Sequence, residues 1–179
     1  LLGSRQSSVE FVDALSDAAR KFEKIYQIDF GNDSIAVRSV TALWRVSYDE
    51  WVPALLAYLN NPVSDMQMAE FVQLMERITM QNWVRRLGRT ARLTVYFKLI
   101  GAINSGKNAE EIREIFRAGA NNEEFFGLLS GSIYGIPAAK AILMRLEEGM
   151  QDESVTKSYS GRITIEHILP QALKDDYWK

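Results

Sequence analysis

The chain has 179 residues, 47% of them hydrophobic, which is enough apolar material to build a soluble globular domain. A net charge of −2 argues against a strongly basic nucleic-acid binder, and the absence of cysteine excludes disulfide scaffolds, zinc–thiolate sites and cysteine nucleophiles. No apolar run approaches the roughly 20 residues of a membrane span, and the N-terminus does not have the pattern of a signal peptide, so we expect a cytoplasmic protein.

Apolar residues recur at three- and four-residue spacing through most of the sequence, which predicts an all-α bundle of about seven to nine helices. The first helix is expected over residues 8–27, where Ser7 and Glu10 have the spacing of a capping box. Its apolar residues share one face: Val9, Val12, Leu15, Ala19, Phe22 and Tyr26. A second helix is expected to begin near Asp33 or Ser34.

The third helix is expected to begin around residues 47–49 and to end at residues 60–62, with Pro53 in its first turn or at a kink. The longest helix follows it. Ser64 and Gln67 would cap this helix, Gly88 would stop it, and its methionines are interpreted as core residues.

Four more helices are expected after Gly88. One ends near residues 104–106, and Asn108 and Glu111 have the spacing to cap the next. A shorter helix passes through Phe125, and Pro137 is placed as the first residue of the last helix. The sequence therefore predicts a helical domain over residues 1–148.

A change of character follows this domain. Residues 149–162 are polar and contain two glycines, which is typical of a linker, and residues 163–165 have the β-branched composition of a strand. Residues 163–179 are therefore expected to form a separate segment.

His167 is the one histidine of the chain, and it follows Glu166 and precedes Pro170. An acid beside a histidine, after a short β-branched run and before proline, is typical of the first half of a His-Me finger (HNH) nuclease. A neutral imidazole can take the proton from an attacking water, and a carboxylate can bind the hard cation Mg²⁺. A polar loop without chemistry is the alternative interpretation of these residues.

The sequence Thr164-Ile165-Glu166-His167-Ile168-Leu169-Pro170-Gln171 resembles the opening motif of the nuclease domain in GmrSD-type modification-dependent restriction endonucleases. Residues 141–147 are similar to the helix that precedes that motif, and the helical layout of residues 8–148 is similar to the family's connecting segment. The resemblance implies that His167 is the general base, that Glu166 is a Mg²⁺ ligand, and that DNA is the substrate.

Two parts of that family's architecture are not found in this sequence. The second strand and the helix of the ββα-metal finger, and the ParB-like nucleotidase domain, would lie beyond residues 1–179. The abrupt start at residues 1–4 also indicates a cut within a longer protein. We therefore expect the full-length protein to be a Mg²⁺-dependent endonuclease and this chain alone to be inactive and to bind Mg²⁺ weakly.

Residues 77–108 contain no acidic side chain and form the most basic stretch of the chain. Four arginines bracket Gly88, where they could contact DNA phosphates: Arg85, Arg86, Arg89 and Arg92. The alternative is that these arginines complement a helix C-terminus or solvate a surface.

Two hypotheses follow. In the first, the helical region couples a nucleotidase to an HNH nuclease. In the second, it is a non-catalytic helical protein-interaction module in which Glu166 and His167 are incidental. The first implies DNA and the two missing segments as partners, and a homo-oligomer is left open. A reading frame that continues past residue 179 into a strand, an Asn-rich loop and a helix would favour the first hypothesis.

Overall fold

The computed structural model of the protein describes residues 8–150 and 163–165. These residues contain eight helices and no strand, which confirms the all-α prediction for this part of the chain. The helices are α1 (Ser8–Tyr26), α2 (Ser34–Trp44), α3 (Val52–Asn60), α4 (Met68–Val84), α5 (Arg89–Asn104), α6 (Ala109–Gly119), α7 (Asn122–Leu129) and α8 (Ala139–Met150).

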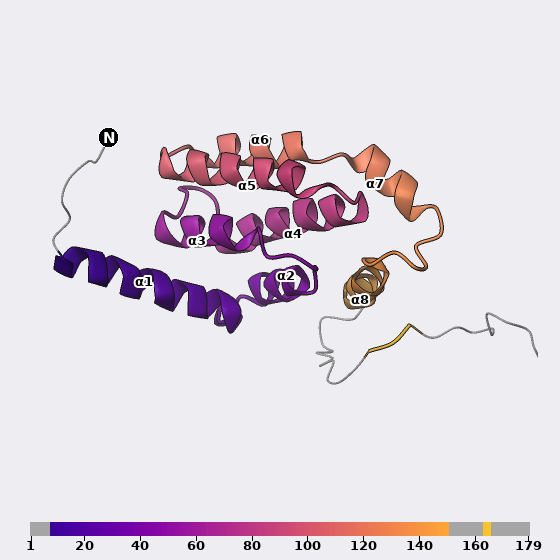
Figure 1. The fold of residues 1–179 in the computed structure, drawn as a ribbon, viewed down its shortest axis with the longest axis horizontal. Coiled ribbons are helices and arrows are strands. Elements are labelled where there is room, and N and C mark those ends of the chain that lie inside the picture. Colours follow the sequence, from indigo (N-terminus) through magenta and orange to yellow (C-terminus); the bar gives the residue numbers. More distant parts are fainter. Residues whose placement is uncertain (1–7, 151–162, 166–179) are drawn as a thin grey trace, which may run out of the picture.

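Helices α3 and α4 form the middle layer of the bundle (Figure 1). On one side lie α5 and α6, and on the other lie α1 and α2. Helix α4 contacts α2, α6 and α7, and α3 contacts α1 and α5, so the two helices of the middle layer together connect the outer ones. Helix α8 follows α7 at one end of the bundle and is seen end-on in this view.

Large apolar side chains fill the space around α4. Phe71 is fully buried, with its ring stacked on Tyr58 at 4.2 Å between centroids and its edge against Phe116 at 5.7 Å. Trp51 is also fully buried and meets Trp44 edge-on at 4.9 Å. Aromatic pairs in these geometries add to the stabilisation from burial, so the rings hold α3, α4 and α6 together.

Two helix starts agree with the predictions, and side chains cap both of them. The Asp33 carboxylate accepts a hydrogen bond from the Ala36 amide at 3.0 Å, at the start of α2. At the start of α6, Asn108 and Glu111 form a complete capping box, each side chain accepting a hydrogen bond from the other's backbone amide. Pro53 was predicted to lie either in the first turn of the third helix or at a kink. It lies in the first turn of α3.

Three predicted helix starts are wrong. Helix α3 begins at Val52 instead of residues 47–49, because a turn closed by the Val52 amide and the Asp49 carbonyl precedes it. Helix α4 begins at Met68, so Ser64 lies outside it and does not cap it. Helix α8 begins at Ala139, because Pro137 lies in a turn in which the Ala139 amide donates to the Ile136 carbonyl.

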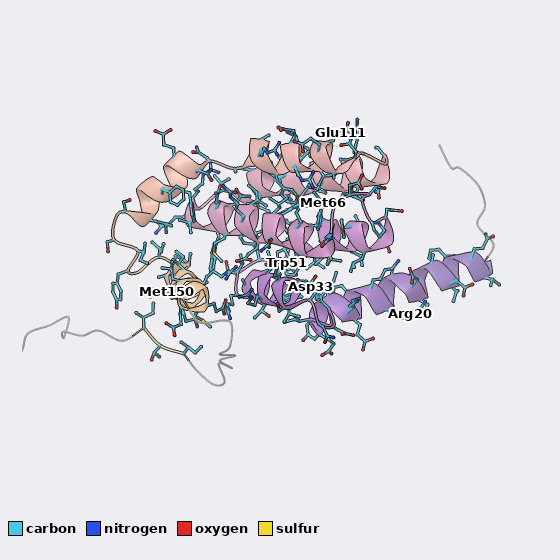
Figure 2. All side chains as sticks on the ribbon, turned by 180° about the vertical axis from the view of Figure 1, so that it is seen from behind. Arg20, Asp33, Trp51, Met66, Glu111 and Met150 are labelled. Carbon is cyan, nitrogen blue, oxygen red and sulfur yellow. The ribbon has the colours of Figure 1, made fainter. Side chains whose placement is uncertain are left out.

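Helix α1 confirms the predicted span, but its apolar face is largely exposed. Leu15 and Phe22 are 59% and 48% exposed, and Ile25 is the one residue of α1 that belongs to the core. Figure 2 shows α1 extending from the rest of the bundle with its side chains spread along it. The periodicity therefore predicted a helix correctly without revealing whether another part of the chain covers it.

Helix α8 is attached to the bundle by charged side chains as well as by apolar contacts. Arg145 donates to Glu76 of α4 at 2.5 Å, and Glu148 accepts from Arg45, after α2, at 2.5 Å. Beside these ion pairs lies a small apolar cluster around Val84, Ala138 and Ile142. The last described helix is thus fixed to two earlier ones.

Candidate nucleic-acid interface

The four arginines predicted to contact DNA lie at the connection between α4 and α5. Helix α4 ends in a Schellman motif, in which the Leu87 amide donates to the Asn82 carbonyl and the Arg86 amide to the Trp83 carbonyl. The left-handed residue of this motif is Arg86, with φ of 55°. Gly88 has an ordinary negative φ and precedes α5 as its N-cap, so the prediction that Gly88 stops the helix is wrong.

Two of the arginines are engaged by acids from distant parts of the chain. Arg85 pairs with Glu124 of α7 at 2.5 Å. Arg92 binds Glu50 through two nitrogens, at 2.6 and 3.2 Å, and donates to the Leu87 carbonyl at 2.7 Å. The side chains of Arg85 and Arg92 are only 13% and 17% exposed, so they are anchored within the fold.

Arg92 also belongs to a buried polar cluster. Its guanidinium lies 4.0 Å from the centre of the Tyr48 ring, and the Tyr48 hydroxyl donates to the Thr79 carbonyl at 2.8 Å. The Thr79 and Tyr96 hydroxyls are 2.9 Å apart. Burial raises the pKa of Tyr96 to about 12 and that of Tyr48 further, so both phenols stay protonated at neutral pH and act as structural hydrogen-bonding groups.

Arg86 and Arg89 are the exposed members of the set. Arg89 is 77% exposed and approaches Glu50 only at 3.7 Å, and Arg86 lies on the surface of the connection. Four arginines and the two glutamates that contact them leave a net charge of +2 at this end of α5. The structure thus divides the four residues into two anchored and two accessible arginines, and DNA contact stays a prediction for the accessible pair.

Glu166 and His167, the predicted metal ligand and general base, lie outside the described residues. Within residues 8–150 and 163–165, no group of three or more His, Asp or Glu side chains could hold a metal ion. Residues 163–165, predicted as a strand, are assigned neither helix nor strand, and a strand requires a partner with which to form backbone hydrogen bonds. The Mg²⁺ site and the nuclease motif therefore stay predictions.

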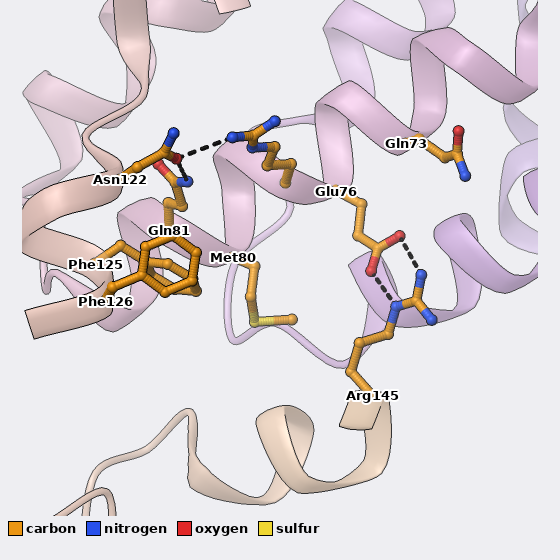
Figure 3. A pocket seen from close by; sticks show the side chains of 9 residues that line it. Gln73, Glu76, Met80, Gln81, Asn122, Phe125, Phe126 and Arg145 are labelled. Carbon is orange, nitrogen blue, oxygen red and sulfur yellow. Dashed lines mark hydrogen bonds and ion pairs between the residues drawn. The ribbon is translucent and has the colours of Figure 1, made fainter. Parts of the chain in front are cut away.

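A pocket of about 330 Å³ lies where α4 meets α7 and α8 (Figure 3). Met80 and the rings of Phe125 and Phe126 form its apolar part, and the Glu76–Arg145 ion pair lies across from the rings. Three other polar lining groups hydrogen-bond one another, since Arg77 and Gln81 both donate to Asn122. These bonds and the Glu76–Arg145 ion pair join α4 to α7 and to α8.

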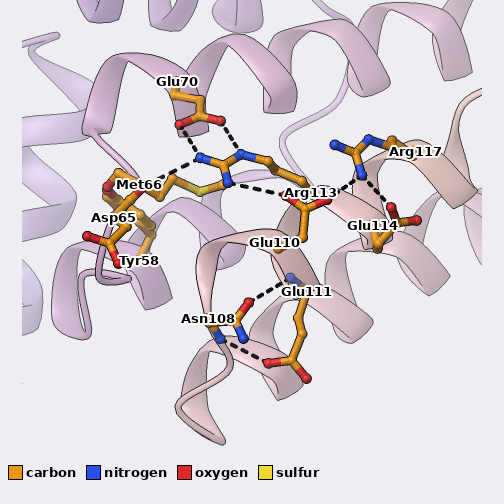
Figure 4. Close-up of polar contacts among 10 residues, drawn as sticks. All are labelled: Tyr58, Asp65, Met66, Glu70, Asn108, Glu110, Glu111, Arg113, Glu114 and Arg117. Atoms are coloured by element: carbon orange, nitrogen blue, oxygen red, sulfur yellow. Dashed lines mark hydrogen bonds and ion pairs between the residues drawn. The ribbon is translucent and has the colours of Figure 1, made fainter.

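A further polar network links α4 to α6 on the surface of the bundle (Figure 4). Arg113 of α6 donates to both carboxylate oxygens of Glu70, at 2.6 and 3.0 Å, and its hydrogen bonds lower the pKa of Glu70. Arg113 also reaches Glu110, which contacts Arg117. The sequence did not indicate which glutamates pair with these arginines. The partners Glu70, Glu76, Glu50 and Glu124 each lie about 40 or more residues from their arginine, so no local spacing connects the two.

Comparison with protein-family models, with curated proteins and with solved structures found no match for this chain. Among the described helices, none is both long and apolar enough to cross a membrane.

Proposed function

We propose that the helical domain is the connector of a GmrSD-type, Mg²⁺-dependent DNA endonuclease whose nuclease finger begins at residues 163–171. The observation that carries the proposal is the motif from Thr164 to Gln171, which contains the chain's one histidine between an acid and a proline. Residues 141–147, which resemble the helix before the family's nuclease motif, lie within α8. The motif would therefore follow a helix of the expected kind.

The attachment of α8 supports this role. A connector that couples two activities needs a firm link to the element that carries the second activity. Ion pairs from Arg145 to Glu76 and from Glu148 to Arg45 fasten α8 to α4 and to the end of α2. A displacement of α2 or α4 would therefore act on α8, and through it on the segment that follows.

In the proposed reaction, His167 would accept a proton from the water that attacks the scissile phosphate, the P–O bond to the leaving sugar oxygen would break, and that oxygen would take a proton from solvent. Glu166 would supply one oxygen ligand to Mg²⁺, an ion that would stabilise negative charge on the phosphate. One carboxylate alone holds Mg²⁺ weakly, so further ligands from the rest of a finger are needed. Arg86 and Arg89 would contact the DNA backbone at the exposed end of α5.

The test is single-turnover cleavage of modified DNA by a protein that carries the complete finger, at saturating Mg²⁺. We expect His167→Ala to lower the rate by about 10²–10⁴-fold, because a positioned base is lost. Nucleotide hydrolysis and folding should be unchanged, since they depend on other parts of the protein. Glu166→Ala should weaken cleavage and shift its metal requirement. Equal rates for wild type and His167→Ala would remove His167 from the mechanism and reject the nuclease proposal.

The second candidate function is a helical protein-interaction module. The exposed apolar face of α1 favours it, because exposed contiguous apolar surface commonly marks a binding site. The two functions separate in the cleavage assay, since an interaction module predicts no dependence of any DNA cleavage on His167.

A further inference from the structure

The pocket where α4 meets α7 and α8 has a volume of about 330 Å³, at the lower end of the roughly 300–1,000 Å³ of small-molecule sites. Its lining on α4 recurs at three- and four-residue intervals and so comes from one face of that helix: Gln73, Glu76, Arg77, Met80 and Gln81. Asn122, Phe125 and Phe126 share one face of α7 for the same reason. The two faces therefore enclose a space that one small molecule can fill.

The apolar part of the pocket is suited to a flat ring. The Phe125 and Phe126 rings lie 5.6 Å apart between centroids, with their planes inclined at 60°. Two rings at this angle form a corner in which a third ring can meet the face of one and the edge of the other. Phe126 is 61% exposed and half-buried Met80 lies beside the rings in Figure 3, where its sulfur can also contact an aromatic ligand.

Arg77 carries the charge of the pocket that no acid neutralises. It donates one hydrogen bond to Asn122 at 3.0 Å and forms no ion pair within the described part of the chain. The Glu76 carboxylate, by contrast, is held by Arg145. Two arginines and one glutamate in the lining leave a net charge of +1, which a ligand with a single negative charge would balance.

The position of Arg77 places this charge next to the rings. Asn122, which accepts the hydrogen bond from Arg77, precedes Phe125 and Phe126 by three and four residues on α7. An anionic group attached directly to an aromatic ring can therefore reach Arg77 while the ring lies in the corner. Gln73 lies one turn before Arg77 on α4, and its amide has no hydrogen-bond partner among the described residues, so it is available to a second oxygen of the same group.

We propose that this pocket binds a small aromatic carboxylate, with its ring against Phe125 and Phe126 and its carboxylate at Arg77. A carboxylate matches the single unpaired cation, whereas a phosphate dianion would leave one negative charge unbalanced. The ligand would touch α4 and α7 and, at Arg145, also α8. The proposal does not depend on the nuclease proposal, because no residue from 163 to 171 takes part.

A titration of the full chain with naphthoate, followed by amide NMR shifts, tests the site. We expect saturable shift changes at residues of α4 and α7 that line the pocket. Neutral naphthylmethanol, which has a similar size, should bind about three- to tenfold more weakly, because it lacks the charge-assisted hydrogen bond. Shift changes that do not saturate, or equal affinity for the two compounds, would overturn the proposal.

Two variants at exposed positions separate the charge from the ring. Arg77→Gln can still donate to Asn122, so it should weaken naphthoate binding about three- to tenfold and leave naphthylmethanol binding unchanged. Phe126→Leu should weaken the binding of both compounds about two- to tenfold. Arg38→Gln on α2 and Phe97→Leu on α5 are the matched exposed controls and should change neither affinity. Naphthoate binding that survives both pocket variants unchanged would place the ligand elsewhere and reject the site.

Discussion

Helices α6 and α8 are both attached to α4, but by different balances of forces. Helix α6 places Ile112 and Phe116 in the apolar core, and the Phe116 ring meets Phe71. Helix α8 joins a smaller apolar cluster and relies on the Arg145–Glu76 and Arg45–Glu148 ion pairs. Salt does not screen apolar contacts, whereas it weakens an ion pair to the extent that the pair is exposed, and the Arg145 side chain is 33% exposed. The attachment of α8 should therefore depend more on salt concentration than the attachment of α6.

The largest effect is expected in the core around α6. Phe71→Ala removes a fully buried ring that contacts Tyr58 and Phe116, and it should lower the free energy of unfolding by about 3–5 kcal/mol. Urea denaturation measures this change. Phe97→Ala, at an exposed position of α5, should change it by less than about 0.5 kcal/mol. Similar losses for both variants would mean that α6 is not held mainly by core packing.

A smaller effect is expected at the attachment of α8. Glu76→Met leaves the Arg145 guanidinium without its main partner. It should lower the free energy of unfolding by about 1–3 kcal/mol, which lies between the values for exposed and buried ion pairs. The double variant Glu76→Met, Arg145→Met should recover part of this loss, because no charge is left unpaired. Hydrogen exchange of the α8 amides at low and high salt measures the attachment directly. Lys140→Met, exposed on α8, serves as the control. No change in α8 exchange would contradict an ionic attachment.

The arginines near Gly88 also differ in how firmly they are held, since two are anchored by acids and two are exposed. DNA binding can test this difference. The double variant Arg86→Ala, Arg89→Ala should bind DNA more weakly. The slope of log binding constant against log salt concentration should become shallower by about two, since each phosphate contact contributes about 0.9. The double variant Arg38→Ala, Lys140→Ala changes the net charge equally at exposed positions elsewhere and should keep the slope. Equal slopes in a salt titration of wild type and the Arg86, Arg89 variant would assign these arginines another role.

The smallest effect concerns the partly exposed ion pair between Glu70 and Arg113. Its hydrogen bonds lower the folded-state pKa of Glu70, so the pair contributes stability above the ordinary glutamate pKa of about 4.3. That contribution is lost as pH falls through the lowered folded-state pKa. Glu70→Gln should therefore be slightly less stable than wild type at pH 7, and the difference should vanish in acid. Urea titrations of wild type and Glu70→Gln at pH 7 and in acid measure this difference, and an equal difference at both pH values would contradict the prediction.

Local patterns determined the helices of this protein. Apolar periodicity predicted an all-α bundle, and side-chain caps fixed the starts of α2 and α6, because Asp33 and Asn108 hydrogen-bond amides only a few residues away. Such contacts involve neighbours in sequence, so spacing alone reveals them. The starts of α3 and α8 were missed because turns closed by backbone hydrogen bonds precede them, and no side-chain spacing marks those turns.

Only the tertiary structure determined which side chains of those helices are paired, buried or exposed. The acid-free stretch around Gly88 looked uniformly basic in the sequence, yet folding brings Glu50 and Glu124 against Arg92 and Arg85. The amphipathicity of α1 likewise did not reveal whether its apolar face is covered, and the folded bundle leaves Leu15 exposed. Charge and burial depend on distances between residues far apart in the chain, and these distances exist only after the helices have packed.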